Sequence, residues 1–178
     1  MTASGFSKKW YALHTRSRFE HVVLDGLIRK KIEAFLPKIT VRSKRVDRKK
    51  MIQVPLFSGY LFVHTSLDPR AHLEVVKTIG VVKMVGNRQG PVPIAEESIA
   101  SLKIMVESNQ PIITGTEFRS GDRVMVVTGP FTGVTGIFDR YRGQGRVVVL
   151  IEALGQYAAV DVREDEIEVI QDDILITA

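Results

Sequence analysis

The residues best placed to do chemistry in this chain are closely spaced cations. Residues 42–50 contain six of them, Arg42, Lys44, Arg45, Arg48, Lys49 and Lys50. Such a cluster repels itself unless water or a polyanion surrounds it, and each phosphate that it neutralises makes binding weaken with added salt. The cluster therefore indicates either a nucleic-acid contact or a solvated basic surface without a partner.

The distribution of charge along the chain favours the nucleic-acid contact. Residues 1–50 hold fourteen Lys or Arg against four acidic residues, a net charge of +10, whereas residues 51–178 carry a net charge of −5. A basic first quarter joined to an acidic remainder is typical of a protein whose N-terminal part meets a polyanion.

A second group of residues suits binding to another protein. The stretch 51–65, MIQVPLFSGYLFVHT, is rich in large apolar and aromatic side chains. In an extended chain Tyr60 and Phe62 point to one face, and Leu61 and Val63 point to the other. Because both faces are apolar, the stretch predicts a central strand. It is either a core strand buried on both sides or a strand with one face that docks a partner.

Catalytic and metal-binding patterns are missing from the sequence. The chain has no Cys, which excludes disulfides, thiol catalysis and Cys-based zinc sites. Its four His residues show no i,i+4 pairing, and no GxSxG, P-loop or GxGxxG motif occurs. We expect no enzyme, cofactor or metal site. With no secretory signal and no apolar run of about 18 residues, we expect a cytoplasmic protein without a membrane span.

The elements that position these residues alternate between strands and helices up to about residue 106. Residues 10–15 and 60–65 are strand-like, and residues 38–56 predict a long β-hairpin whose tip is the basic cluster. Helices are expected from about residue 17 to 31, from 69 to 78 and from 96 to 106. The fold class expected is α+β, an antiparallel sheet with flanking helices.

Two of these helices have predicted caps and buried faces. The first is expected to begin with a capping box of Ser17 and Glu20. Its apolar stripe is predicted to be Phe19, Val22, Val23, Leu27 and Ile28. The second is expected to begin at the N-cap Asp68, with Pro69 first in the helix. Its inward residues are predicted to be Leu73, Val76 and Ile79.

The last third of the chain has a different composition. Residues 107–117 lack periodicity and contain Pro111 and Gly115, so they are expected to form a linker. From residue 118 onwards, glycines separate five short Val-rich runs. This pattern predicts a small β-barrel.

Three motifs in order resemble the NusG family of transcription elongation factors. They are WYALHTRSRFE near the start, LFSGYLFV in the middle and GDRVMVVTGPFTGVTGIF in the last third. The resemblance implies an N-terminal NGN domain, an α/β sandwich, over residues 1–106, a linker over 107–117 and a C-terminal KOW domain, an SH3-like barrel, over 118–178. The first motif and the basic hairpin look more like the specialised RfaH-like paralogues than the housekeeping factor.

The resemblance also implies a function. NGN domains bind the clamp helices of RNA polymerase, suppress pausing and termination, and lie beside the non-template DNA of the transcription bubble. KOW domains recruit Rho or a small-subunit ribosomal protein. We therefore expect a monomeric processive antitermination factor. A ribosome- or RNA-binding KOW protein without a polymerase role is the alternative.

Matching positions supply candidate site residues. The polymerase clamp would be contacted by Trp10, His14, Leu56, Phe57, Tyr60 and Phe62. A second polymerase contact would involve Ala71, His72 and Leu73. Nucleic acid would be contacted by Arg16, Arg18, Arg29, Thr78, Lys44, Arg45, Lys49 and Lys50, and the KOW partner by an exposed Phe131. Two positions depart from the pattern, because Ser58 stands where Pro is usual and Ile79 where RfaH has a basic residue.

Overall fold

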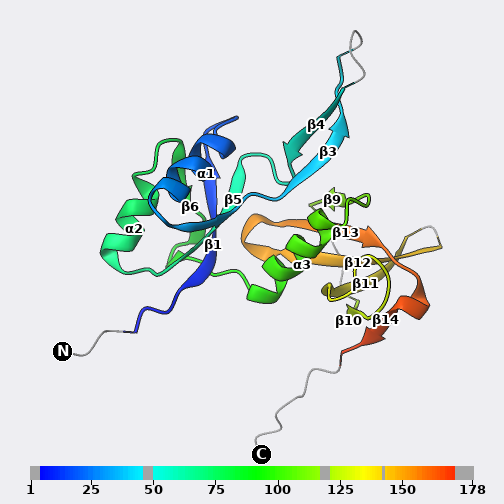
Figure 1. The fold of residues 1–178 in the computed structure, drawn as a ribbon. Helices are drawn as coiled ribbons and strands as arrows, with labels where there is room; N and C mark the ends of the chain where they lie inside the picture. Colours follow the sequence, from blue (N-terminus) through cyan, green and yellow to red (C-terminus); the bar gives the residue numbers. More distant parts are fainter. Residues whose placement is uncertain (1–4, 46–49, 117–120, 142, 171–178) are drawn as a thin grey trace, which may run out of the picture. The chain divides into compact units, whose positions relative to one another are not determined.

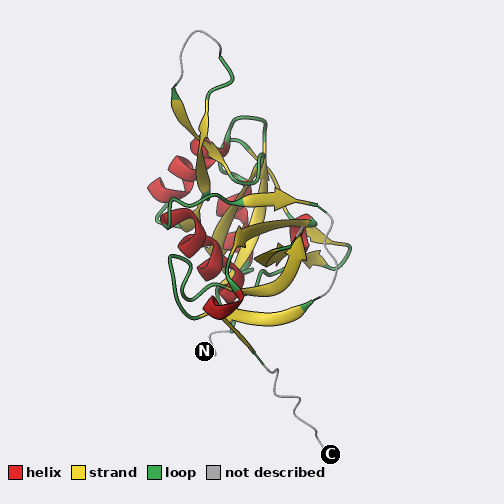
Figure 2. Cartoon of the chain, turned by 90° about the vertical axis from the view of Figure 1, so that its right-hand side faces the viewer, coloured by secondary structure: helices red, strands yellow, loops and turns green. Residues whose placement is uncertain are grey.

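A computed structural model of the chain describes residues 5–45, 50–116, 121–141 and 143–170. The residues group into two compact units. The N-terminal unit comprises Met1–Ile99 and Glu152–Leu154, and the C-terminal unit comprises Ala100–Ile151 and Gly155–Ala178. Figure 1 follows the order of the elements along the chain, and Figure 2 distinguishes helices from strands.

The N-terminal unit is built on a four-stranded antiparallel sheet with the strand order β2-β5-β1-β6. β1 spans Lys9–Thr15, β2 spans Glu33–Phe35, β5 spans Tyr60–Thr65 and β6 spans Val81–Met84. The aromatic and β-branched residues of β5 suit an inner strand. The prediction of a central strand at residues 60–65 is confirmed, because β5 pairs with β1 on one side and β2 on the other.

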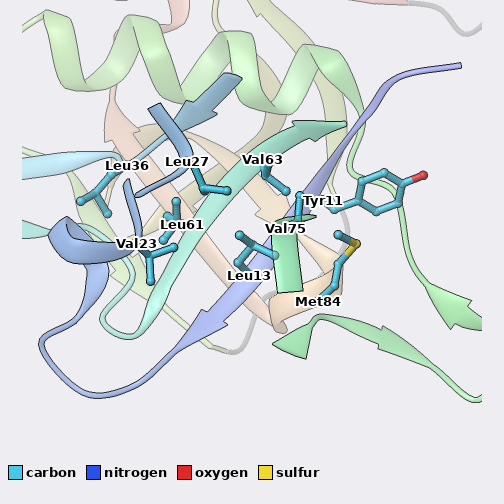
Figure 3. Close-up of a cluster of buried hydrophobic side chains, with 9 residues drawn as sticks. All are labelled: Tyr11, Leu13, Val23, Leu27, Leu36, Leu61, Val63, Val75 and Met84. Atoms are coloured by element: carbon cyan, nitrogen blue, oxygen red, sulfur yellow. The ribbon is translucent and has the colours of Figure 1, made fainter. Parts of the chain in front are cut away.

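One face of this sheet packs against two helices, α1 (Glu20–Arg29) and α2 (Pro69–Val76). Figure 3 shows the resulting core, which consists of Tyr11, Leu13, Val23, Leu27, Leu36, Leu61, Val63, Val75 and Met84. The hydroxyl of Tyr11 points away from this cluster, and burial raises the pKa of its phenol. The core fixes the sheet to α1 and α2 and leaves the opposite face of the sheet to other residues.

Helix α1 differs from its prediction at its start and on its buried face. Its N-cap, Phe19, makes no side-chain capping bond, so the predicted capping box of Ser17 and Glu20 is wrong. Val23 and Leu27 are fully buried as expected, but Val22 and Ile28 are 46% and 57% exposed. The sheet covers only a narrow stripe of the helix, so apolar residues beside that stripe reach solvent.

Helix α2 keeps its predicted start but not its predicted buried face. The Asp68 carboxylate accepts a hydrogen bond from the Arg70 N–H at 3.3 Å, which confirms Asp68 as the N-cap. The helix buries Val75, whereas Leu73 is exposed and Ile79 lies beyond the end of the helix with 75% of its surface exposed. The prediction that Leu73 and Ile79 point inward is therefore wrong.

The predicted β-hairpin is confirmed, and it forms a separate two-stranded sheet of β3 (Lys38–Arg42) and β4 (Met51–Pro55). Ile39 pairs with Val54 and Val41 pairs with Ile52, so one face of the ribbon is apolar. The hairpin projects away from the four-stranded sheet (Figure 1). A shorter hairpin joins β7 (Gly86–Asn87) to β8 (Gly90–Pro91).

The C-terminal unit contains a six-stranded antiparallel sheet with the order β14-β10-β11-β12-β13-β9. The strands are β9 (Ile113–Gly115), β10 (Asp122–Val126), β11 (Thr135–Tyr141), β12 (Gln144–Ile151), β13 (Gln156–Asp161) and β14 (Ile167–Val169). A short 3-10 helix, Glu164–Glu166, precedes β14, and a second one, Glu152–Leu154, follows β12 in sequence but belongs to the N-terminal unit. A small β-barrel was expected here; the β-rich fold is confirmed, but in the described residues no strand pairing closes the sheet, and β14 and β9 form its two edges.

Part of the predicted linker is regular structure. Within residues 107–117, β9 pairs with β13, so Ile113–Gly115 belongs to the sheet. Gly115 lies directly against the Tyr157 ring, where a Cβ atom would meet the ring at 2.5 Å. Pro111 therefore precedes a strand, and Gly115 allows that strand to pack closely against Tyr157, so these two residues do not indicate an unstructured linker here.

Helix α3 (Glu96–Glu107) closes the expected N-terminal domain of residues 1–106, and the division between the two units falls within it, after Ile99. Its apolar residues Ile99, Leu102 and Met105 are fully buried, and Val106 is half-buried. Within the C-terminal unit, the Ser101 hydroxyl accepts a hydrogen bond from the Thr135 N–H at 2.9 Å and donates one to the Thr135 carbonyl at 3.2 Å. In the part of the chain that the structure describes, neither α3 nor any other helix is long and apolar enough to cross a membrane.

Candidate functional site

The sheet face opposite α1 and α2 is lined with aromatic and imidazole rings. Alternation along paired strands places side chains of β1, β2 and β5 together there. We call this surface the aromatic face, and it consists of Trp10, His14, Phe35, Tyr60, Phe62 and His64. The rings stack in pairs, with centroid distances of 5.0 Å for Trp10 and His64, 5.2 Å for His14 and Tyr60, and 6.2 Å for Phe35 and Phe62.

The residues predicted to contact the polymerase clamp fall into two groups. Trp10, His14, Tyr60 and Phe62 lie on the aromatic face, and Leu56 and Phe57 lie in the turn before β5. Phe57 is only 1% exposed and meets the Phe62 ring edge-on at 6.1 Å. Trp10, Leu56 and Phe62 are also buried, whereas His14 and Tyr60 are half-buried. The stacked pair of His14 and Tyr60 is therefore the part of the group most accessible to a partner.

The second predicted polymerase contact lies elsewhere on the N-terminal unit. Ala71, His72 and Leu73 belong to α2, which packs on the core side of the sheet. Ala71 and His72 are half-buried, and Leu73 is exposed. The structure therefore does not bring these three residues together with the aromatic face.

Four of the eight predicted nucleic-acid residues, Arg16, Arg18, Arg29 and Thr78, lie around α1 and the loop after α2. The Arg16 N–H donates a hydrogen bond to the Gly80 carbonyl at 2.8 Å, which joins the approach to α1 to the loop 78–80. Arg18 is exposed and has a backbone φ of +64°, which is uncommon for a residue other than glycine. Arg29 and Thr78 line the same pocket. Thr78 is far in sequence from the three arginines, and the fold brings all four residues to one side of the N-terminal unit.

The pocket has a volume of about 500 Å³ and combines cationic with apolar walls. It is lined by Val22, Asp25, Gly26, Arg29, Lys30, Lys77, Thr78 and Ile79. The Lys30 ammonium group donates hydrogen bonds to the Glu74 carbonyl at 2.7 Å and to the Thr78 hydroxyl at 3.2 Å. Cations outnumber the one acid in the lining, and Val22 and Ile79 add exposed apolar surface. Such a mixture suits a ligand with both an anionic group and a flat apolar group.

The remaining predicted residues are dispersed. Lys44, Arg45 and Lys50 are exposed near the tip of the β3–β4 hairpin, and Lys49 lies outside the described residues. Phe131, expected to be exposed, is 6% exposed, so this expectation is wrong for the structure. It lies in the loop before β11, whose first residue, Thr135, holds Ser101 of α3.

Comparisons with known proteins agree with this architecture. The family model described as "Transcription termination factor nusG" matches residues 8–103, which is more than half of the chain. The chain belongs to the NusG family. Proteins named transcription termination/antitermination protein NusG from Thermus thermophilus and Deinococcus radiodurans are each 29% identical to it, over 87% of this chain and 95% of theirs. A solved structure of NusG from Thermotoga maritima shares its fold, with a TM-score of 0.52, 24% identity, and coverage of 93% of this chain and 98% of that one.

The matched NusG region contains both the aromatic face and the pocket beside α1. Sequence reasoning missed Phe35 and His64 on the aromatic face and Lys30 and Lys77 in the pocket. His64 follows Phe62 by two positions, so strand alternation was a usable signal. The pocket residues carry no such signal, because α1 and the loop after α2 meet only in the folded unit.

Proposed function

We propose that this NusG-family chain is a transcription elongation factor that binds the clamp helices of RNA polymerase through its aromatic face. It suppresses pausing and termination by staying bound to the transcribing enzyme. The aromatic face carries this proposal. Its accessible part, the stacked rings of His14 and Tyr60, supplies flat contact area of the kind that dominates binding energy at protein interfaces, whereas Trp10 and Phe62 are buried.

The burial pattern identifies the side chain that tests the clamp contact. Tyr60 is half-buried and stacks on His14, so its removal takes away contact surface without opening the packed core. Phe57 is a poorer test because its nearly complete burial makes a loss of folding and a loss of binding hard to separate. Tyr60 is therefore the preferred substitution.

Tyr60→Ala is expected to weaken binding of the chain to RNA polymerase from its own organism by at least roughly tenfold, the loss typical of a central aromatic contact. Affinity is measured by titrating labelled chain with the purified polymerase. Val82→Ala is the matched control, because Val82 is an exposed apolar residue on the edge strand β6. Equal affinities for the two variants would contradict the clamp proposal.

We also propose that the pocket beside α1 receives the non-template DNA strand. Arg29, Lys30 and Lys77 supply positive charge for phosphates, and Val22 and Ile79 offer apolar surface for a base. Arg16 and Arg18 extend the positive charge towards the start of α1. The hairpin tip, with Lys44, Arg45, Lys49 and Lys50, adds a second basic surface that contacts nucleic acid.

We propose that residues 1–106 act as an NGN domain and that residues 118–178, which belong to the C-terminal unit, act as a KOW domain that recruits a small-subunit ribosomal protein or Rho. We propose Ala71, His72 and Leu73 as the second polymerase contact. Phe131 is the proposed partner contact, and it must become accessible for this role because it is buried here. Sedimentation of the chain with ribosomes, together with no measurable affinity for polymerase, would favour a ribosome-binding protein instead.

A further inference from the structure

A buried carboxylate reaches the turn that precedes β5. Glu20, the first residue of α1, is 5% exposed. Its Oε1 accepts a hydrogen bond from the Gly59 N–H at 2.8 Å, across 39 positions of sequence. Burying a carboxylate is unfavourable unless it is hydrogen-bonded, so this bond is a specific feature of the site rather than an incidental surface contact.

The turn that Glu20 reaches has a defined geometry. The Tyr60 N–H donates to the Phe57 carbonyl at 3.1 Å, and Gly59 has a φ of +83°. A positive φ at the third of four residues is the mark of a type II β-turn, in which the N–H of that third residue is not used by the turn itself. Glu20 accepts from this available N–H, and the Thr15 N–H donates to the Gly59 carbonyl at 2.8 Å. Hydrogen bonds to Glu20 and Thr15 therefore fix the peptide groups before and after Gly59.

Ser58 makes the turn more dependent on this support. Proline is favoured at the second position of a type II turn because its ring fixes φ near the required value. Ser58 occupies that position here and leaves φ free. The conformational restriction that proline would supply from within the turn must then come from contacts outside it.

We infer that Glu20 is a positioning residue for the polymerase-binding turn, Leu56–Tyr60. By holding the Gly59 N–H, its carboxylate fixes the directions in which Phe57 and Tyr60 leave the turn. The inference rests on the proposed clamp contact and adds a residue of α1 that touches no partner. It also predicts that Glu20 and Ser58 act on the same property, the order of the turn, so their substitutions should not be additive.

Two conservative substitutions separate hydrogen bonding from charge. Glu20→Gln keeps the length of the side chain and an oxygen acceptor, whereas Glu20→Asp keeps the charge but withdraws the carboxylate by one methylene group. Polymerase affinity is expected to stay within about threefold of the parent for Glu20→Gln and to fall roughly tenfold for Glu20→Asp, the effect of losing a hydrogen bond to a charged group. The reverse order would overturn the inference.

A second substitution tests whether the effect passes through the turn. Adding Ser58→Pro to Glu20→Asp is expected to restore most of the affinity, because proline reorders the turn from within. The amide signal of Gly59 in an NMR spectrum should lose its protection from hydrogen exchange in Glu20→Asp but not in Glu20→Gln. A weakened affinity that Ser58→Pro leaves unchanged would show that Glu20 has only a general structural role.

The outcomes also separate this inference from the clamp proposal. If Tyr60→Ala weakens polymerase binding and Glu20→Asp does not, the clamp contact stands and the role of Glu20 is rejected. If Tyr60→Ala leaves binding unchanged, the clamp proposal itself fails, and exchange at Gly59 still decides whether Glu20 orders the turn.

Discussion

Replacing Leu61 by alanine is expected to lower the free energy of unfolding of the N-terminal unit by about 2–5 kcal/mol, the range for truncating a fully buried leucine. Leu61 is completely buried in the core between the sheet and its two helices. Its truncation leaves a cavity in the middle of the central strand, where neighbouring strands cannot easily collapse. Urea unfolding followed by Trp10 fluorescence measures the change, because Trp10 is the only tryptophan of the chain and lies on β1.

Ile28→Ala is the control for the Leu61 measurement. Ile28 is also a large aliphatic residue of the N-terminal unit, but it is 57% exposed on α1. Its truncation should change the free energy of unfolding by no more than about 0.5 kcal/mol. Equal effects of the two substitutions would contradict the assignment of the core to the α1 and α2 side of the sheet.

Reversing two charges in the pocket beside α1 is expected to weaken binding of single-stranded DNA by roughly ten- to a hundredfold at low salt. The variant is Arg29→Glu combined with Lys77→Glu, and both residues line the pocket. The logarithm of affinity should also fall less steeply with the logarithm of salt concentration, the slope decreasing by about 0.7 for each phosphate that the pocket no longer neutralises. Fluorescence anisotropy with a mixed-sequence oligonucleotide at several salt concentrations measures both quantities.

A matched control distinguishes a local interaction from a general effect of charge. Arg88→Glu also reverses a charge on an exposed residue of the N-terminal unit, but in the turn between β7 and β8. It should change affinity much less than the pocket variant and leave the salt dependence close to that of the parent. Equal weakening per reversed charge at Arg88 and in the pocket would reject the pocket as a DNA site.

Much of the fold could be predicted from local sequence patterns. Apolar residues on both faces identified β5 as an inner strand, and Asp68 followed by Pro69 identified the start of α2. The buried face of α1 was harder to predict, because apolar residues also flank the narrow stripe of the helix that contacts the sheet. Only tertiary packing decides that Val23 is buried and Val22 is not.

The candidate site was predictable where its residues lie on one strand and not where it depends on distant partners. Tyr60 and Phe62 share a face by alternation alone, but Phe35 joins them only through the pairing of β2 with β5. Glu20 has a reasonable local role as a capping residue, yet its observed partner is Gly59. The capping prediction failed because it considered only backbone groups close to Glu20 in sequence, whereas the Glu20 carboxylate accepts a hydrogen bond from the distant Gly59 N–H.

The alternation along β5 restricts how this chain can change in length. Tyr60 and Phe62 contribute to the aromatic face while Leu61 and Val63 fill the core, so two sets of residues with different roles share one strand. Substitutions can alter one set and spare the other. Insertion or deletion of a single residue between Tyr60 and Val63 would exchange the two sets for the rest of the strand. Related sequences should therefore vary in composition here but keep a constant spacing from Tyr60 to Val63, which an alignment of homologues can check.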